Sequence, residues 1–590
     1  MKEIIIGIDL GTTNSEVAIV ENGRVRVISD ETKRRILPSV VGITEDGTLL
    51  VGEPARNQYI LYPERTVRSI KRKMGSDEPV DLAGQKYTPQ EISAIILKRL
   101  KTIAEADLGQ PIKKAVITVP AYFSDAQRQA TREAGEIAGL EVVRMINEPT
   151  AAALAYEAGH QGQRRILVYD LGGGTFDVSV VSMEDGVVEV LASHGNNFLG
   201  GDDFDDKVVS FITDHLKAHH GVDVRESRRV MARIRRIAES SKIALSDSPF
   251  IRIEEEYLTE KDGTPVHLSV ELSRDEYETL ITPFIDETLN AVHTALKGAG
   301  LTASAIDEVL LVGGATRTPL IYRRLKDILG KDPRGEVDPD LCVAMGASIQ
   351  GGMIAGENVN AVLVDVTPYT FGTSAVGMLH GVFSPNCFVP IIHKNSTIPV
   401  TKTESFATLH DEQEKVDVQV YQGENPDATR NTLIGEFTIV GLSRVPAGNI
   451  VLVRLSLDSD GILHVTAVEK ATGLEKSITI HGAVSRLEGA KLATARDRIH
   501  SLFGEQDDVI NQVTPTDASS TTEINSHQVV IQARALVEKA ERSIEGASDE
   551  DRDEIVNLIE TIRDALAADR LDDLKDPVEE LSDILYYLEN

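Results

Sequence analysis

The chain has 590 residues, of which 41% are hydrophobic and 26% charged, the composition of an ordinary folded protein with several cores. Its formal net charge of −32 argues against nucleic acid or an anionic membrane as the main partner. The only two cysteines, Cys342 and Cys387, cannot form a four-cysteine zinc site or a disulfide framework, so we expect reduced thiols. No apolar run approaches ~18 residues and no signal peptide is evident, so we expect a cytoplasmic protein that spans no membrane.

Strand-like and helical runs alternate from Lys2 to about Gly356, which predicts an α/β fold. The clearest strands are expected at 4–8, 115–119, 166–169 and 309–312, and the clearest helices at 90–108, 125–138, 203–219 and 280–297. After about Ala361 the pattern changes to the alternation typical of half-buried strands, as in 416–420. Two alternating runs, 451–457 and 463–467, flank the turn signal Asp460-Gly461 and predict a hairpin in an all-β domain.

From Val530 onward apolar residues recur at helical spacing. The segment 514–526 is polar and shows no period, so we expect a loop there. Residues 546–590 are strongly acidic, which is most simply a solvated helical face, with a specific acidic interaction surface as the alternative. The patterns divide the chain into residues 1–356, a linker at 357–367, a β domain at 368–483 and a helical region at 484–590.

Two segments repeat one arrangement: a strand, an aspartate, a glycine-bearing turn with hydroxyl groups, and a second strand. They are Asp9-Leu10-Gly11-Thr12-Thr13-Asn14 and Asp170-Leu171-Gly172-Gly173-Gly174-Thr175-Phe176-Asp177. Glycines let backbone N–H groups approach an anion, and the hydroxyls add donors. Because carboxylates repel phosphate, we expect the paired aspartates to hold a hydrated Mg²⁺ between two turns that clamp a triphosphate.

Neither turn is a P-loop, because the string G-x-x-x-x-G-K-[ST] is absent, and neither is a Rossmann fingerprint, because each turn returns to a strand. A third glycine turn, Gly313-Gly314-Ala315-Thr316-Arg317, also follows a strand. Its two glycines would admit a nucleobase or sugar, and Arg317 could stack on the purine. One such turn alone is usually only a turn, but three in this order indicate a nucleotide site.

The order of the three turns resembles the actin, hexokinase and heat-shock chaperone ATPase superfamily. The strings at 69–72, 116–123, 125–131 and 146–153 narrow the resemblance to the 70-kDa heat-shock chaperone family of the bacterial DnaK type. The resemblance is specific over residues 1–356 and looser over 357–483. It implies a multidomain protein: an α/β actin-like two-lobed ATPase domain, then a β-sandwich peptide-binding domain and a short α-helical lid, which the loop at 514–526 would interrupt.

On matching positions, the resemblance implies that Lys71 positions or activates the attacking water and that Thr175 lies near the γ-phosphate. Asp9, Glu148 and Asp170 would orient the waters around Mg²⁺, while Asp9, Asp170 and Asp177 are candidates to hold K⁺. These roles agree with phosphoryl transfer as mainly positioning and charge neutralisation. The other residues expected to bind ATP or ADP are Gly11, Thr12, Thr13, Asn14, Gly172, Gly173, Gly174, Gly200, Gly201, Glu239, Lys242, Ser246, Gly313, Gly314, Arg317 and Asp340.

The resemblance further implies that the β domain holds an extended apolar peptide in a channel. The matching channel positions are Thr373, Val376, Phe406, Leu409, Val416 and Val418. Thr373 replaces a usually larger apolar residue, Leu409 a usually small one, and the segment 377–393 is longer and different, so the peptide preference is open. The alternative is that these six are ordinary core residues of a β-sandwich.

Between the two domains lies Val362-Leu363-Val364-Asp365, which is apolar where a simple tether would be polar. The resemblance implies that it docks between the ATPase lobes with ATP and is released with ADP, with Pro120 and Arg128 relaying the change. The alternative is that it is merely the first strand of the β domain. The implied partners are unfolded or extended peptide clients, a nucleotide-exchange factor, and a J-domain co-chaperone that contacts Arg144, Asn147 and Thr150.

Three functions are compatible with a nucleotide site of this kind. An ATP-dependent chaperone would use hydrolysis to control the binding and release of hydrophobic peptide segments, for many clients or for one dedicated client. A small-molecule kinase of the same superfamily would leave residues 361–590 without a purpose, and an actin-like filament protein should end near residue 350. The chain length and the family-specific strings favour the chaperone.

Overall fold

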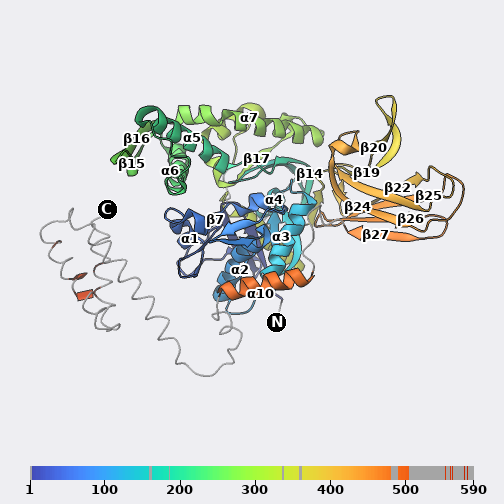
Figure 1. Cartoon of the computed structure of the whole chain (residues 1–590), viewed down its shortest axis with the longest axis horizontal. Coiled ribbons are helices and arrows are strands. Elements are labelled where there is room, and N and C mark those ends of the chain that lie inside the picture. Colours follow the sequence, from blue (N-terminus) through green and yellow to red (C-terminus); the bar gives the residue numbers. More distant parts are fainter. Residues whose placement is uncertain are drawn as a thin grey trace, which may run out of the picture. The chain divides into compact units, whose positions relative to one another are not determined.

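The structure is a computed structural model that describes residues 3–157, 162–184, 186–334, 338–357, 362–479 and 489–503, with a few isolated residues beyond (Figure 1). The chain forms two compact units, Met1–Gly504 and Glu505–Asn590, and the elements below belong to the first. The loop expected at 514–526, the acidic segment 546–590 and most of the lid expected at 484–590 lie outside the described residues. Most of the boundary segment at 357–361 does so as well.

The first sheet has the strand order β11-β10-β1-β2-β3, with β4 paired to β2. Its central strand runs parallel to β10 and antiparallel to β2. Helices α2 and α3 share the core of one face, and α9 packs on the other, where a Cβ on Gly7 would lie 2.0 Å from the Ser348 nitrogen. The elements are β1 (Ile5–Leu10), β2 (Asn14–Glu21), β3 (Arg24–Val27), β4 (Leu37–Pro38), α2 (Pro89–Leu108), β10 (Lys114–Val119), α3 (Asp125–Ile137), β11 (Glu141–Asn147) and α9 (Cys342–Ile354).

The second sheet repeats this arrangement, since β12 runs antiparallel to β13 and parallel to β17, in the order β17-β12-β13-β14-β18-β21. Helices α5 and α7 share a core with β12 and β13. The elements are α4 (Glu148–Glu157), β12 (Arg164–Leu171), β13 (Phe176–Glu184), β14 (Val187–Asn196), α5 (Gly201–His220), α6 (Arg228–Asp247), α7 (Arg274–Gly298), β17 (Glu308–Val312), α8 (Pro319–Leu329), β18 (Val362–Val366) and β21 (Thr397–Ile398).

Several smaller strands and helices surround the two sheets. They are β5 (Val40–Ile43), β6 (Leu49–Val51), α1 (Glu53–Gln58), β7 (Thr66–Arg68), β8 (Val80–Leu82), β9 (Gln85–Tyr87) and the hairpin β15 (Phe250–Lys261) and β16 (Thr264–Ser273). A short 3-10 helix, Ile70–Lys73, follows β7 and carries Lys71. Within the described residues, no helix combines the length and apolar character that crossing a membrane requires.

The strands and helices expected in the first 356 residues are present, and helix capping explains the main difference in their bounds. The helix expected at 280–297 begins earlier, at Arg274, because Ser273 and Glu276 form a capping box. Helices α2 and α3 begin after the capping residues Thr88 and Ser124 in the same way. Sequence periodicity marks the buried stretch of a helix, whereas the cap sets where it starts.

Two four-stranded antiparallel sheets follow, β20-β19-β23-β24 and β22-β25-β26-β27, and they share one apolar core. The hairpin expected around Asp460-Gly461 is confirmed, since β25 pairs with β26 across it. The elements are β19 (Phe371–Leu379), β20 (Val382–Ile392), β22 (Val400–Ala407), β23 (Lys415–Gln422), β24 (Thr432–Val440), β25 (Ile450–Leu457), β26 (Leu463–Glu469), β27 (Glu475–Thr479) and α10 (Gly489–Phe503). We call the residues 367–479 the β unit.

The apolar segment between the domains forms β18. It pairs in parallel with β14 of the second sheet and antiparallel with β21, so it joins that sheet to the β unit. Leu363 packs against the adjoining core, but Val362 is 56% exposed. The docking of this segment with ATP and its release with ADP stay predictions.

Candidate functional site

The two aspartate–glycine turns face one cavity of about 330 Å³. The third glycine turn, β2, the 3-10 helix of Lys71, α4 and α6 complete its wall. The predicted residues that line it are Asp9, Gly11, Thr12, Thr13, Asn14, Lys71, Glu148, Asp170, Gly172, Gly173, Thr175, Gly201, Glu239, Lys242, Gly313, Gly314, Arg317 and Asp340. Gly174, Gly200, Ser246 and Asp177 are not part of the lining. The fold thus brings together residues from distant parts of the chain.

Close backbone packing explains the glycines of the second turn. A Cβ on Gly173 would lie 1.9 Å from the Thr13 hydroxyl, and one on Gly200 would lie 2.5 Å from the Gly173 backbone. The amide of Gly201 donates to the Gly172 carbonyl at 2.9 Å, which ties the start of α5 to this turn. The first N–H groups of a long helix therefore lie beside the cavity, a position that favours an anion. Gly200 supports this turn from behind the cavity wall.

One lysine and three carboxyl groups surround the floor of the cavity. Lys71 is 4% exposed and donates to Glu148. Asp9 accepts a 2.7 Å hydrogen bond from the Thr118 hydroxyl, whereas Oδ2 of Asp170 is buried without a hydrogen-bond partner. The cluster therefore gathers three carboxyl groups around one lysine, with one buried oxygen free to accept a hydrogen bond.

The carboxyl groups of this cluster are hard to ionise. Burial raises the pKa of Glu148 to about 7 although Lys71 opposes the shift. Burial and then the carboxyl of Glu148 raise the pKa of Asp170 well above its usual value, and burial also raises that of Asp9. Burial works against the charged form of Lys71, but Glu148 and Asp9 prevail and raise its pKa, so the lysine is an ammonium.

These residues fit a hydrated divalent cation. Such an ion would relieve the repulsion among the carboxyl groups. One of its bound waters would donate a hydrogen bond to the unpartnered oxygen of Asp170. In the described part of the chain no three acidic, histidine or cysteine side chains are grouped so as to ligate a metal directly. The buried carboxyl groups and the unpartnered oxygen of Asp170 have the chemistry that a hydrated ion such as Mg²⁺ would need.

Asp177 does not reach the cavity. Its carboxyl accepts hydrogen bonds from the backbone of Ala121 at 3.2 Å and Tyr122 at 3.1 Å. Burial raises its pKa to about 7 although these bonds oppose the shift. In this geometry Asp177 fixes the loop after β10, next to the buried Pro120, and it lies directly opposite Asp170 in the β12–β13 ladder.

The wall on the side of α6 holds the predicted adenosine contacts. Lys242 pairs with Asp205 at 2.9 Å and donates to the Gly201 carbonyl at 3.1 Å. Arg317 pairs with Asp340 at 2.8 Å on the opposite wall. Ser246 lies one helical turn beyond Lys242, outside the lining. Sequence reasoning missed Ile243, which lines the cavity and is 60% exposed; its signal was an apolar residue on the polar side of this helix.

Glu16 was also missed. It lines the cavity, is 2% exposed and lies opposite Asp9 in the β1–β2 ladder. Burial raises its pKa well above the usual value, and Asp9 adds to the shift. The available signal was a charged residue inside an otherwise apolar strand.

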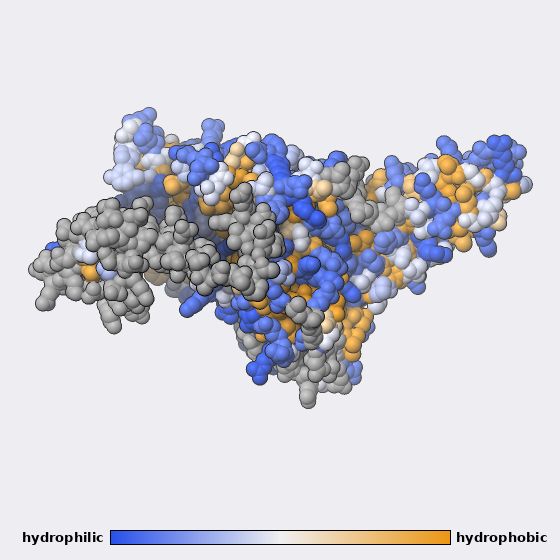
Figure 2. Space-filling model, turned by 90° about the horizontal axis from the view of Figure 1, so that it is seen from below, coloured by the Kyte–Doolittle hydropathy of each residue, from blue (hydrophilic) through white to orange (hydrophobic). Residues whose placement is uncertain are grey.

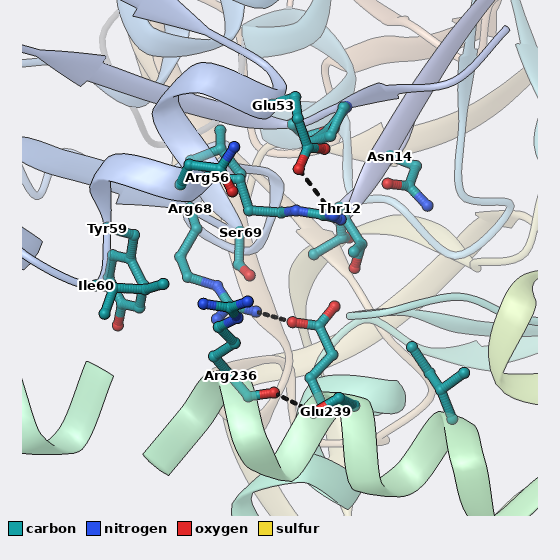
Figure 3. A pocket seen from close by; sticks show the side chains of 17 residues that line it. Thr12, Asn14, Glu53, Arg56, Tyr59, Ile60, Arg68, Ser69, Arg236 and Glu239 are labelled. Carbon is teal, nitrogen blue, oxygen red and sulfur yellow. Dashed lines mark hydrogen bonds and ion pairs between the residues drawn. The ribbon is translucent and has the colours of Figure 1, made fainter. Parts of the chain in front are cut away.

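A second cavity of about 250 Å³ adjoins the first, and the two share Thr12, Thr13, Asn14, Glu239 and Ile243. Figure 3 shows Arg68 of β7 reaching toward Glu239 of α6, at 3.6 Å. Arg68 also lies over the ring of Tyr59, 5.5 Å from its centre. This ion pair joins the two sides of the cleft above the turns, and no sequence pattern predicted it.

The six predicted channel residues differ in their surroundings. Thr373 is 3% exposed and donates to the Gln419 carbonyl at 2.7 Å, and Val418 is a core residue. Phe406 and Val416 pack partly against the same core, whereas Val376 and Leu409 project into solvent. The core alternative thus describes Val418, and Val376 and Leu409 are the most exposed of the six.

The predicted coupling and co-chaperone residues converge on two aspartates. Asp365 accepts hydrogen bonds from Asn147 at 2.9 Å and Thr150 at 3.1 Å. The guanidinium of Arg128, which is 5% exposed, donates to Asn147 at 2.7 Å and to the Asp460 carbonyl at 3.4 Å. Arg144 lies 3.6 Å from the Asp460 carboxyl, where Arg132 also binds at 2.5 Å. These contacts join β11 and α4 to β18 and to the β25–β26 turn.

Known proteins are similar to this chain over most of its length. A model of the Hsp70 protein family matches residues 5–589. The chaperone protein DnaK of Thermotoga neapolitana is 49% identical over 495 residues, which cover 82% of this chain and 81% of that protein. The chaperone protein DnaK of Thermosipho africanus is 45% identical over 581 residues, covering 96% and 92%. That of Thermosipho melanesiensis is 48% identical over 488 residues, covering 82% and 80%.

Proposed function

Because the chain belongs to the Hsp70 family of ATP-dependent molecular chaperones, we propose that its facing turns hydrolyse ATP to control how the β unit holds an extended peptide. One observation carries the chemical part. Two aspartate–glycine turns and the Lys71–Glu148 pair line a single cavity. A triphosphate between the turns would meet backbone donors on both sides and a buried ammonium near its terminal phosphate.

The residues divide the chemical work. The turns and the start of α5 bind and orient the phosphates, and Mg²⁺, when bound, neutralises the charge that develops on them. Lys71 is protonated, so it positions the attacking water and stabilises negative charge and does not act as a base. Asp9, Glu148 and Asp170 orient the water shell of the ion, and Thr175 contacts the terminal phosphate. We assign a K⁺ role to Asp9 and Asp170, and to Asp177 only if its backbone contacts rearrange.

On the opposite side, Glu239, Lys242 and Ser246 of α6 would hold the adenosine, facing Gly313, Gly314 and Arg317. Ile243 adds an apolar surface for the base. The pairing of Arg317 with Asp340 orients the guanidinium on that wall. Burial of a flat ring between Ile243 and Arg317 would explain why an exposed isoleucine is tolerated there.

The two four-stranded sheets of the β unit would form the β-sandwich that takes clients, with residues 484–590 as a lid. The clients are unfolded or extended hydrophobic segments, which the channel at Val376, Leu409 and Val416 contacts. A J-domain co-chaperone, meeting Arg144, Asn147 and Thr150, and a nucleotide-exchange factor complete the cycle. A cytoplasmic location agrees with the family and with two cysteines that are free thiols.

Coupling would run through β18. With β18 paired to β14 and Asp365 bound by Asn147 and Thr150, the β unit is attached to the ATPase domain. We assign this arrangement to the ATP-bound state, in which clients exchange, and the released arrangement to ADP. A client that favours the arrangement in which β18 is released must then weaken the binding of ATP relative to ADP, because coupling between two binding sites is reciprocal. We propose that the same shift brings the chain closer to its hydrolysing conformation.

The test is ATP turnover by the full chain, with and without an unfolded, non-native protein as client. We expect slow basal turnover that the client increases several-fold. Turnover that needs a sugar or another small hydroxyl acceptor would indicate a kinase, and turnover unchanged by any client would contradict the chaperone cycle.

A further inference from the structure

The hairpin of β19 and β20 differs in composition from the rest of the chain. Residues 371–392 contain no Asp, Glu, Lys or Arg, although 26% of all residues are charged. This hairpin includes most of the segment 377–393 that departs from the family pattern. It extends from the β unit as the yellow loop of Figure 1. A protein with a net charge of −32 thus carries one uncharged arm.

The tip of this arm is apolar on both faces. Met378 lies opposite Phe383 in the ladder, and Leu379 lies opposite Val382. Because neighbouring residues of a strand point to opposite faces, the two pairs cover the two sides of the hairpin. Figure 2 shows the β unit from below, at the right of the view, where hydrophobic and hydrophilic residues are interspersed on its surface. Met378 is 62% exposed, Val382 68% and Phe383 74%. A contiguous exposed apolar surface of this kind marks a binding site.

The backbone at this tip is also available for pairing. Strand β19 pairs with β23 only from Phe371 to Thr373, and β20 is the outermost strand of the sheet. Among the described residues, β19 beyond Thr373 pairs only with β20, whose other edge makes an isolated bridge from Cys387 to Asp427. Pro385 lacks an N–H and blocks pairing along β20, so the open edge is that of β19. An extended chain could add to this edge as a further strand.

We propose that the β19–β20 tip is a second contact surface for the client, which takes an uncharged, apolar, extended segment along the edge of β19. The inference rests on the proposed function, because its occupant is the polypeptide that the channel holds. Continuity selects this occupant: the predicted channel residues Thr373 and Val376 lie on β19 itself, and Met378 follows two positions later. A second copy of the chain is disfavoured, since two chains of charge −32 repel each other.

The proposal predicts a dependence on client length. A peptide that only fills the channel ends near Val376. A strand rises about 3.3 Å per residue, so an extension of about five residues would pass Met378 and Phe383 and reach the end of the hairpin. Longer apolar peptides should therefore bind more tightly than short ones, and the tip side chains should account for the gain.

The experiment uses the full chain with ADP and fluorescein-labelled peptides. One short peptide has a leucine-rich core, and two longer ones add about five uncharged apolar residues at the N- or the C-terminus of that core. At least one long peptide should bind about tenfold more tightly than the short one, a gain of about 1.4 kcal/mol. The double variant Met378→Ser, Phe383→Ser should lose this gain and keep the affinity for the short peptide.

Tyr257→Ser is the matched control, because Tyr257 is 65% exposed on another hairpin and should leave the gain intact. The single variant Phe383→Ser should lose part of the gain in affinity. It keeps the test decisive if the double variant does not fold. If the gain persists in both tip variants, the inference is overturned while the proposed function stands. If even the short peptide fails to bind the unmodified chain, the proposed function fails and the inference with it. A dimer that the tip substitutions convert to monomer would instead assign the surface to a second copy.

Discussion

Asn147 donates a 2.9 Å hydrogen bond to Asp365, which lies 218 residues later in the chain. The residue after Asn147 is Glu148, which accepts from Lys71 in the cavity. One peptide bond therefore separates the contact to β18 from the contact to the buried lysine. Any shift of β11 and α4 that accompanies nucleotide binding must act on both contacts, which gives the proposed coupling a short physical route.

Replacing Lys71 by Ala should abolish hydrolysis while ATP still binds. The buried ammonium is the one positive group beside the carboxyl cluster of the cavity floor, whereas phosphate binding is shared among many backbone donors. We expect the single-turnover rate to fall at least about a hundredfold, with nucleotide affinity changed only a few-fold. Lys73→Ala is the control, since Lys73 is exposed in the same short helix and pairs with Glu78. Near-normal turnover in Lys71→Ala would remove Lys71 from the mechanism.

Removing Arg68 should speed the release of nucleotide. The ion pair with Glu239 joins the two sides of the cleft and is partly shielded from solvent. A partly exposed pair contributes about 0.2–1 kcal/mol, so stopped-flow release of labelled ADP should accelerate about two- to fivefold in Arg68→Ala. Arg56→Ala is the matched control, because Arg56 pairs with Glu53 within the same helix. Equal release rates in both variants would show that the pair does not hold the cleft closed.

The stability of the ATPase domain should fall with rising pH because of Asp177. Its pKa is raised to about 7 in the folded chain and is near 3.8 when unfolded, so the folded form binds more protons between these values. Stability from this group is fully present below about pH 4 and is lost as pH rises toward 7. The melting temperature of Asp177→Asn should therefore decline less between pH 5 and pH 8 than that of the unmodified chain. Parallel pH profiles would mean that Asp177 is not protonated in the fold.

Val416→Phe should block peptide binding without unfolding the β unit. Val416 packs only partly against the core, so a channel in front of it would accept the larger ring. A fully packed site would be strained at a cost of about 1–3 kcal/mol. Peptide binding by fluorescence and thermal melting separate these cases. Normal peptide binding, or a β unit that simply melts, would show that Val416 does not line the channel.

The sequence predicted the parts of the site that obey local rules. Asp9 and Asp170 lie at the ends of buried strands, each followed by its glycine turn. The order strand–turn–strand alone places each turn at the edge of its own sheet. Glu16 escaped prediction although a charged residue in an apolar strand was a local signal, because Asp9 lies opposite it only once β1 and β2 pair. Arg68 escaped prediction because its importance depends on a contact with Glu239 in a distant segment. No local pattern encodes such contacts.

The same limit applies to the predicted roles that the structure rearranges. Asp177 belongs to the second motif in sequence, but the backbone of residues 121 and 122 binds its carboxyl. Val362 shares the apolar character of Leu363, yet it is 56% exposed while Leu363 packs against the adjoining core. Composition identifies what a segment can bind, and only the tertiary fold decides which of its side chains do so.

The most direct test of the account is the rate at which a bound fluorescent peptide leaves when ATP is added. In the unmodified chain, ATP should accelerate release at least about tenfold over ADP, a coupling of about 1.4 kcal/mol. In Leu363→Asp, Val364→Asp, which destroys the docking of β18, basal hydrolysis and peptide affinity with ADP should persist while this acceleration disappears. Loss of peptide affinity together with retained ATP-triggered release would contradict the account, because β18 would then serve only the β unit.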